Sequence, residues 1–355
     1  MPATLHQIAR AAKVSVSTAS RALNGHPAIS SQTAQRVRSA AQRLQYRQRR
    51  SHRRWEARRS LAGTHVAVVS LGMDRSLMAL PVIGGILAGA EAALSDAGAT
   101  VQLAHVPLVD QPPPSLLRQK LDGVILSGAL QGDMLSQAGG ELLARLRTLP
   151  AVWLLGRPRG CWGDAVVAND YQVGAWAAEY LVHHGHRRLA FVNPKPDHIL
   201  FMRREDAFVA TARRLGANVR CYCHEPPQHW ELPLKAPVDV ETVQGLIDEL
   251  LADDPRPSAI FAAADSVAVL VYRALAVRDL RVGRDISVIS GNNDQPLIAG
   301  LHPKLTTTDV HPSDIGRLAV GQLAMRLSCA NALPESELMI PPAPVEGESV
   351  ARIGG

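Results

Sequence analysis

The 355-residue sequence predicts two parts with different architectures: a small all-α head and an α/β body with two doubly wound parallel sheets. Apolar residues recur at helical spacing through the first 45 positions, and short β-branched runs alternate with helical stretches from His65 onward. Charge is divided just as sharply. Residues 1–60 hold 13 Lys and Arg and one acid, whereas the remainder holds 25 bases and 31 acids. The head, and not the body, is therefore expected to meet a polyanion.

Composition excludes several classes of protein. Hydrophobic residues make up 46% of the chain and charged residues 20%, which is typical of a packed globular protein rather than a disordered one. No apolar run reaches the roughly 18 residues of a membrane span, and no basic-then-apolar leader opens the chain. The four Cys are few and scattered, which favours a reducing, cytoplasmic compartment without a disulfide framework.

The head, residues 1–46, is predicted as three helices. Residues 4–7 fit a capping box, and the apolar helix face that follows must stop near Lys13. Ser15 can cap a second short helix and Ser30 a third. Two short helices on a tight turn, followed by a third, form a helix-turn-helix, the alternative being a plain three-helix bundle with a solvated basic face. The second helix turns small, polar or basic side chains outward, as a helix entering a DNA groove requires: Val16, Ser17, Ser20 and Arg21.

These residues carry a resemblance. Residues 4–24, continued by residues 29–30 and 44–46, are similar to the N-terminal signature of the lactose-repressor (LacI/GalR) family of bacterial transcription regulators. The resemblance implies that three side chains read bases in the major groove: Val16, Ser17 and Arg21. It also implies a set of phosphate contacts: Ser15, Thr18, Ser20, Asn24 and Thr33.

The segment 47–63, an expected hinge or linker, departs from the family pattern. The family carries a short hinge whose Leu wedges into the minor groove, and such wedging kinks the duplex. Residues 47–59 instead hold seven Arg and no Pro. Counting along the family pattern nominates Trp55 as the wedge, whereas the local string nominates Leu61, which we prefer. The Arg run, in which we assign Arg49 to a phosphate, can equally be a generic phosphate tether that never forms a helix.

From His65 onward, two series of strands and helices follow one another. The first series comprises strands at 66–69, 100–105, 123–126 and 152–155 and a helix at 82–97. The second comprises strands at 166–167, 189–192, 259–262 and 286–289 and helices at 171–184, 204–215 and 266–278. Such alternation indicates parallel sheets wrapped by helices, with a ligand crevice at the carboxyl ends of the strands. We expect residues 64–355 to form an effector-binding and dimerisation domain with two subdomains: 64–165 with 310–326, and 166–309 with 327–355.

The body resembles the effector-binding part of the same family, which is itself similar to periplasmic sugar-binding proteins. The strings that carry this resemblance are dispersed: Leu121–Leu126, Gly185–Arg188, Ala263–Asp265, Leu305–Thr308 and Gly347–Val350. The resemblance implies a homodimer on a pseudo-palindromic double-stranded DNA operator. A small effector would shift the balance between open and closed subdomains, and so reposition the heads.

The family pattern also implies an effector pocket. Arg204 stands four residues before a Phe, as the pattern requires, and further pocket residues are expected at Asp265, Arg157 and His198. Asn293 replaces an Asp of the family, unless the register slips by one. An amide lacks the charge and half the acceptor capacity of a carboxylate, whereas Arg forks suit carboxylates and phosphates. We therefore expect a polar effector, a sugar or sugar derivative, and an anionic one rather than a neutral sugar. For each residue the alternative is a solvated charge or subdomain packing.

No catalytic constellation emerges, so we expect neither enzymatic activity nor a cofactor. The sequence lacks a Gly-x-Ser-x-Gly elbow, a phosphate-binding loop and a His-Glu-x-x-His motif. Residues 221–224 supply too few spaced ligands for a metal, and His183–His186 matches a helix-to-strand corner of the family. The sequence thus predicts a regulator of the repressor type, in the cytoplasm and on the nucleoid when bound. Its rivals are a cytoplasmic ligand-binding protein with no specific DNA role, and an enzyme with a regulatory head.

Overall fold

The computed structural model describes residues 5–15, 18–19, 22, 31–43, 61–227, 229–235, 240–329 and 333–353. The chain forms two compact units, Met1–Glu56 and Ala57–Gly355. The break between them falls inside the Arg-rich segment. Within the described ranges, no helix has both the length and the apolar character needed to cross a bilayer.

Among the described residues of the first unit, the helices α1 (Leu5–Ala12) and α3 (Ser31–Arg43) pack against each other. Their contact is made by small side chains, which allow short helices to approach closely. The same core includes two residues of the segment between the helices. Its buried members are Ala9, Ala12, Ala19, Ala22, Val37, Ala40 and Ala41.

Local chemistry sets the end of α1 and the start of the next turn. Lys13 takes a left-handed φ of 53°, and the Val14 amide donates back to the Ala9 carbonyl at 3.0 Å. A left-handed residue that closes a backward hydrogen bond is a common helix end. Ser15 Oγ then accepts from the Thr18 amide at 3.0 Å, which is the cap that the sequence predicts.

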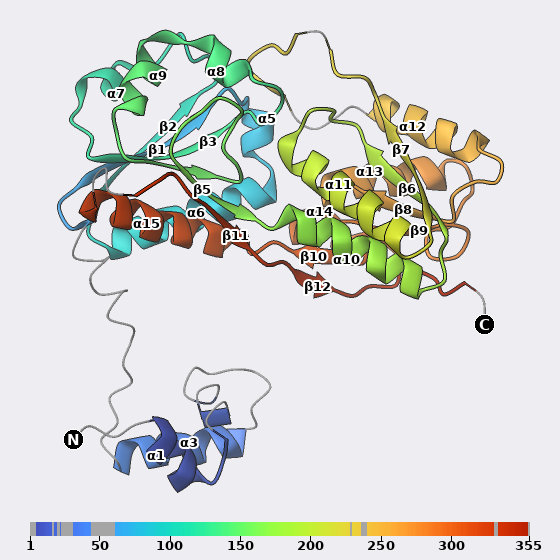
Figure 1. The fold of residues 1–355 in the computed structure, drawn as a ribbon, viewed down its shortest axis with the longest axis horizontal. Coiled ribbons are helices and arrows are strands. Elements are labelled where there is room, and N and C mark those ends of the chain that lie inside the picture. Colours follow the sequence, from blue (N-terminus) through green and yellow to red (C-terminus); the bar gives the residue numbers. More distant parts are fainter. Residues whose placement is uncertain are drawn as a thin grey trace. The chain divides into compact units, whose positions relative to one another are not determined.

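The second unit begins with a six-stranded parallel sheet in the order β11-β5-β4-β3-β1-β2 (Figure 1). Its strands are β1 (His65–Leu71), β2 (Thr100–Val106), β3 (Gly123–Gly128), β4 (Ala151–Leu154), β5 (Asp164–Ala168) and β11 (Glu337–Ile340). Side chains alternate between its faces, so that Val66 and Val68 belong to one core and Ala67 and Val69 to another. The first core is covered by α6 (Pro81–Asp96) and α15 (Pro312–Ser328), and the second by α7 (Pro114–Arg118), α8 (Met134–Ala138) and α9 (Gly140–Arg147).

A second parallel sheet of four strands has the order β7-β6-β8-β9. Its strands are β6 (Arg188–Asn193), β7 (Asn218–Cys223), β8 (Ala259–Ala262) and β9 (Ser287–Ile289). One face packs on α10 (Asp170–His183) and α11 (Ile199–Arg214), and the other on α12 (Val240–Ala252) and α13 (Asp265–Ala276). The remaining elements are α5 (Arg75–Met78), α14 (Gln295–Ile298) and an antiparallel pair, β10 (Thr307–Asp309) with β12 (Ala343–Val345).

Two parallel sheets covered by helices confirm the predicted fold class of the body. The chain passes from one sheet to the other between β5 and α10, between β9 and α15, and between β11 and β12 (Figure 1). Two expectations were wrong. The strand at 166–167 was assigned to the second series, yet β5 pairs with β4 in the first sheet. Residues 327–355 were placed with the second sheet, yet β11 pairs with β5 at the edge of the first. A half-exposed, four-residue run has no periodicity that identifies which of two sheet edges it joins.

Candidate functional site

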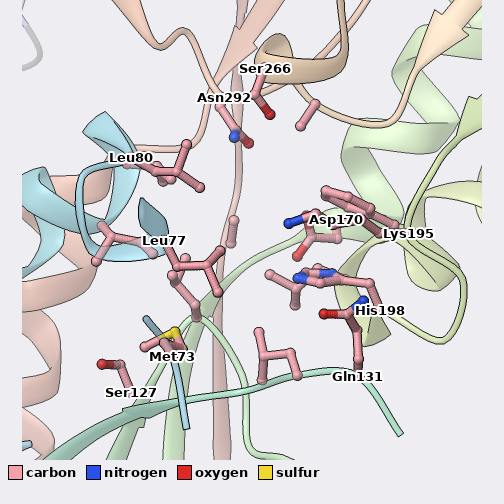
Figure 2. A pocket seen from close by; sticks show the side chains of 18 of the residues that line it. Met73, Leu77, Leu80, Ser127, Gln131, Asp170, Lys195, His198, Ser266 and Asn292 are labelled. Atoms are coloured by element: carbon pink, nitrogen blue, oxygen red, sulfur yellow. The ribbon is translucent and has the colours of Figure 1, made fainter. Parts of the chain in front are cut away.

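A cleft separates the two subdomains at the carboxyl ends of their strands, where doubly wound folds bind ligands. The space between its walls, open solvent included, amounts to about 1110 Å³. The two sides differ in chemistry. Figure 2 shows Met73, Leu77 and Leu80 on one side, with Asp170 and Lys195 facing them from the other.

The first subdomain supplies the apolar side, and it also contributes the polar Ser127 and Gln131 at and just after the end of β3. Met73 follows β1, Leu77 belongs to α5, and Leu80 precedes α6. Asp74 orients this segment, because its carboxylate accepts from the Ser76 amide at 2.8 Å and the Leu77 amide at 3.3 Å. The hydrogen bond from the Ser76 side chain, more than any other contact, lowers the pKa of Asp74, so this cap is an anion.

Arg204 lies at the polar side, only 3% exposed, and its guanidinium is held by the protein itself. Nε donates to Asp170 Oδ1 at 2.7 Å, and Nη2 donates to Asn292 Oδ1 at 2.9 Å. Nη1 donates to the Ala263 carbonyl at 2.7 Å and to the Gly291 carbonyl at 3.4 Å. The structure thus brings the predicted Arg204 to the cleft, but as a neutralised side chain that ties α10 and α11 to the ends of β8 and β9.

A glycine makes this arrangement possible. A Cβ at Gly174 would lie 2.0 Å from the Arg204 carbonyl oxygen, far inside van der Waals contact. The absent side chain therefore lets α10 and α11 approach closely enough for Arg204 to reach Asp170 at the start of α10.

Asp265 does not line the cleft, contrary to expectation. Its carboxylate is fully buried and accepts from the Asp294 amide at 2.7 Å, from Thr307 Oγ1 at 2.8 Å and from Ser290 Oγ. A carboxylate that has three donors of its own has little capacity left for a ligand. Asp265 instead holds the loop that follows β9.

Asn293 was also expected to line the cleft and does not, because the family pattern is shifted by one residue in the loop after β9. Asn293 takes a left-handed φ of 57°, and its Oδ1 accepts from Gln295 Nε2 at 2.6 Å, outside the cleft. The residues on either side, Asn292 and Asp294, line the cleft. Burial, reinforced by the charge of Asp265, raises the pKa of Asp294 to about 6. A carboxyl group is therefore present where the sequence indicated its loss.

Arg157 is the third residue that was expected in the pocket and does not line the cleft. Its Nη1 donates to the Gly163 carbonyl and to Glu335 Oε2, both at 2.7 Å, in the connection between β4 and β5. Arg203, the neighbour of Arg204 in α11, forms an ion pair with Glu337 of β11 at 2.9 Å. Both cations are thus neutralised by partners within the chain, and neither lines the cleft.

His198 lines the cleft as predicted, and Lys195 joins it without having been predicted. The His198 ring lies 4.2 Å from the Phe201 ring, and burial lowers its pKa to about 3, so the imidazole is neutral. Its Nδ1 is buried without a hydrogen-bond partner among the residues that the structure describes. Burial also lowers the pKa of Lys195, to about 8. Its position just after β6, at the carboxyl edge of the sheet, was the available signal.

A strap, residues 229–235, connects the second subdomain to the first. It belongs to the segment between β7 and α12, which reaches toward α5 in Figure 1. The Leu234 amide donates to the Gly72 carbonyl and the Asp74 amide donates to the Leu234 carbonyl, both at 2.8 Å. Leu234 packs into the core of the first subdomain and also lines the cleft.

In the head, three of the expected phosphate contacts can be placed. Ser15 is exposed, while Thr18 and Thr33 are half-buried. The other expected DNA contacts and the alternative wedge lie outside the described residues: Val16, Ser17, Ser20, Arg21, Asn24, Arg49 and Trp55.

Leu61, the preferred minor-groove wedge, needs correction. Its side chain is 1% exposed and packs in the core that α6 and α15 cover. A wedge must present its side chain to DNA, so a residue in this core position is unsuited to the role. The local string around Leu61 reflects an apolar position just before β1.

Comparisons with known proteins indicate the same family as the sequence resemblance. Residues 4–48 match the family model "Bacterial regulatory proteins, lacI family", and residues 178–350 match "Periplasmic binding protein-like domain". The chain is 27% identical to the ribose operon repressor of Escherichia coli (strain K12) over 350 residues, which cover 97% of this chain and 98% of that protein. In fold it is similar to a transcriptional regulator CelR–cellobiose complex (TM-score 0.65, 24% identity, 98% of this chain and 99% of that one). It is also similar to the Lac repressor dimer bound to operator and the anti-inducer ONPF (TM-score 0.64, 21% identity, 99% and 100%).

Proposed function

We propose, since this chain belongs to the lacI family of bacterial regulatory proteins, that it is a transcriptional repressor whose operator affinity is controlled by a small ligand in the cleft. The observation that carries the proposal is the union, in one chain, of a basic head that matches the family's DNA-binding model and a body with a two-sided cleft. The family consists of regulators, and the chain is not an enzyme.

The relatives support the kind of ligand and the assembly. One is named as the repressor of a ribose operon, and one similar structure holds cellobiose, so a polar effector of that size class suits the cleft. The Lac repressor is a dimer on its operator. We infer that two copies of this chain likewise bind a pseudo-palindromic site, since two-fold proteins read two-fold sites. The protein then acts in the bacterial cytoplasm, on the nucleoid when bound.

The DNA contacts that we propose for residues of the head follow from the hydrogen-bonding properties of their side chains. Val16, Ser17 and Arg21 would contact base edges, and an Arg that forms two hydrogen bonds to a guanine distinguishes it from other bases. Arg49 would contact a phosphate, together with Ser15, Thr18, Ser20, Asn24 and Thr33. With Leu61 in the core, Trp55 becomes the proposed wedge.

Selection from a pool of randomised duplexes with the full-length chain tests the proposal. We expect enrichment of a pseudo-palindrome, whose affinity is then measured by fluorescence anisotropy. Arg21→Ala should cost about 1–3 kcal/mol on this site and relax its sequence preference. Arg49→Ala should weaken all duplexes alike and flatten the salt dependence by about one unit. A pool without enrichment would favour the rival, a ligand-binding protein with no specific DNA role.

A further inference from the structure

Lys195 differs from the other basic residues of the cleft region. Arg204, Arg203 and Arg157 each form an ion pair with a carboxylate of the chain. The Lys195 amide donates to Asn193 Oδ1 at 2.9 Å, which fixes the turn after β6. Its ammonium makes no ion pair within the part of the chain that the structure describes, although it lines the cleft. Lys195 is therefore a partly buried cation that is not in direct contact with a carboxylate of the described residues.

The carboxylates that line this part of the cleft are engaged with other groups, and Asp170, on the same side as Lys195, is paired with Arg204. Asp74 attracts Lys195 from across the cleft, but the Asp74 carboxylate is engaged in capping α5. His198 is neutral, and Arg204 adds positive charge. The ammonium therefore gains from any anion that enters the cleft, because opposite charges attract strongly where water is excluded.

The rest of the cleft constrains the remainder of the ligand. Asp170 Oδ1 is paired with Arg204, but Asp170 Oδ2 is buried without a hydrogen-bond partner in the described residues. An unpaired buried acceptor favours a donor on the ligand, such as a hydroxyl. Opposite it, Met73, Leu77 and Leu80 offer hydrocarbon and no hydrogen bonds (Figure 2). The ligand must therefore have an apolar side as well as polar groups.

We propose that the effector is a small hydroxylated monocarboxylate with an apolar flank. Its carboxylate pairs with Lys195 Nζ, a hydroxyl donates to Asp170 Oδ2, and its hydrocarbon part packs on Leu77 and Leu80. A phosphate ester suits the site less, because one ammonium is a poor match for a dianion that Asp170 would also repel. The regulatory meaning of this ligand rests on the function proposed above, whereas its binding does not.

Binding of matched acids and esters to the full-length chain tests this assignment. The probes are shikimate, quinate, mandelate and 3-hydroxybutyrate, each with its methyl ester, together with shikimate 3-phosphate, D-ribose and D-cellobiose. Thermal shift identifies binders and calorimetry measures them. We expect at least one acid to bind about tenfold more tightly than its ester, since loss of a charge-assisted hydrogen bond costs at least that much.

Variants locate the effect. Lys195→Met should abolish the difference between acid and ester, Lys195→Arg should retain most of it, and Lys120→Met, at an exposed site outside the cleft, should leave it unchanged. Acid binding should weaken as the pH rises past about 8, where the free ammonium loses its proton. Among the facing groups, Asp74 is ionised and His198 neutral throughout this range, and Asp294 titrates near pH 6.

Three results would overturn the assignment: tight binding of a neutral sugar that survives Lys195→Met, stronger binding of the phosphate ester than of its parent acid, or no binding by any acid. Circular dichroism establishes that each variant is folded. The same titrations on the chain bound to its selected duplex separate the two proposals. Intact acid binding without any duplex binding would refute the regulator and leave the ligand class standing.

Discussion

Replacing Arg204 by Met tests the structural role that the cleft assigns to this residue. Met fills a similar volume but removes the charge and every donor. Asp170, which is 1% exposed and 2.7 Å from Arg204 Nε, would become a buried carboxylate without a counterion. Breaking a buried pair in this way costs about 3–5 kcal/mol. We expect the free energy of unfolding of the body to fall by that amount at neutral pH.

Chemical denaturation monitored by tryptophan fluorescence measures the loss. Burial already raises the pKa of Asp170 in the wild type, against the lowering effect of Arg204, so removing Arg204 raises the folded-state pKa further. The stability that the protonated form contributes is then present at low pH and lost as the pH rises, so the deficit against wild type should shrink on acidification. Adding Asp170→Asn to Arg204→Met should recover part of the loss, although Asp170→Asn alone destabilises. A variant as stable as wild type would refute the structural role and return Arg204 to the ligand.

Three other perturbations address packing and charge. Gly174→Ala should destabilise the body by about 1–3 kcal/mol, because α10 and α11 must move apart to make room for the added Cβ. Gly245→Ala in α12, where a Cβ meets nothing within 4 Å, should instead stabilise the body by about 0.5–1 kcal/mol. Thermal melts compare the two variants. Leu61→Ala should cost about 2–5 kcal/mol of body stability in denaturant titrations. Unchanged stability with lost operator affinity would instead restore Leu61 as the wedge. Asp294→Asn should raise the free energy of unfolding at pH 7.5 by about 1–3 kcal/mol. A carboxyl group whose folded-state pKa is raised to about 6 stabilises the fold at a pH below its unfolded pKa, and this contribution is lost as the pH rises through 6. Unfolding midpoints that match those of the wild type across a pH series would contradict this.

Periodicity and capping predicted the elements whose signals are local. The stop of α1 at Lys13, the cap at Ser15 and the alternating faces of β1 all follow from residues within a few positions of one another. The two doubly wound sheets were predictable because both faces of their central strands, such as β1, β3 and β8, are apolar. These features depend on short-range sterics and on side-chain direction, which the sequence displays directly.

The cleft was predicted in location but not in its charge pairing. Arg157 and Arg204 both looked like receptors for an anion, yet Glu335 and Asp170 neutralise them from positions 178 and 34 residues away in the chain. At the loop after β9, two consecutive Asn residues left the register open, and a left-handed Asn293 turns its side chain away from the cleft. Pairing between distant residues has no periodic signal, so it was not accessible to pattern analysis.

The strap and β11 were missed for a related reason. Leu234 enters the first subdomain from an irregular segment with no helical or strand spacing, and its two backbone hydrogen bonds can be specified only by the assembled fold. Lys195 was overlooked because a single Lys after a strand is ordinary on a surface. Its place in a cleft lined by both subdomains depends on the assembled fold.

Operator affinity with the cleft filled and with it empty shows whether the cleft controls the head. The selected duplex is titrated with the full-length chain by fluorescence anisotropy, with and without a saturating amount of the strongest ligand among the acids and sugars above. We expect the ligand to change the dissociation constant of the duplex by at least about fivefold, the lower end of typical allosteric coupling, and the duplex to change the ligand affinity by the same factor. Equal duplex affinity with the cleft saturated and with it empty would contradict the claim that the cleft controls the head.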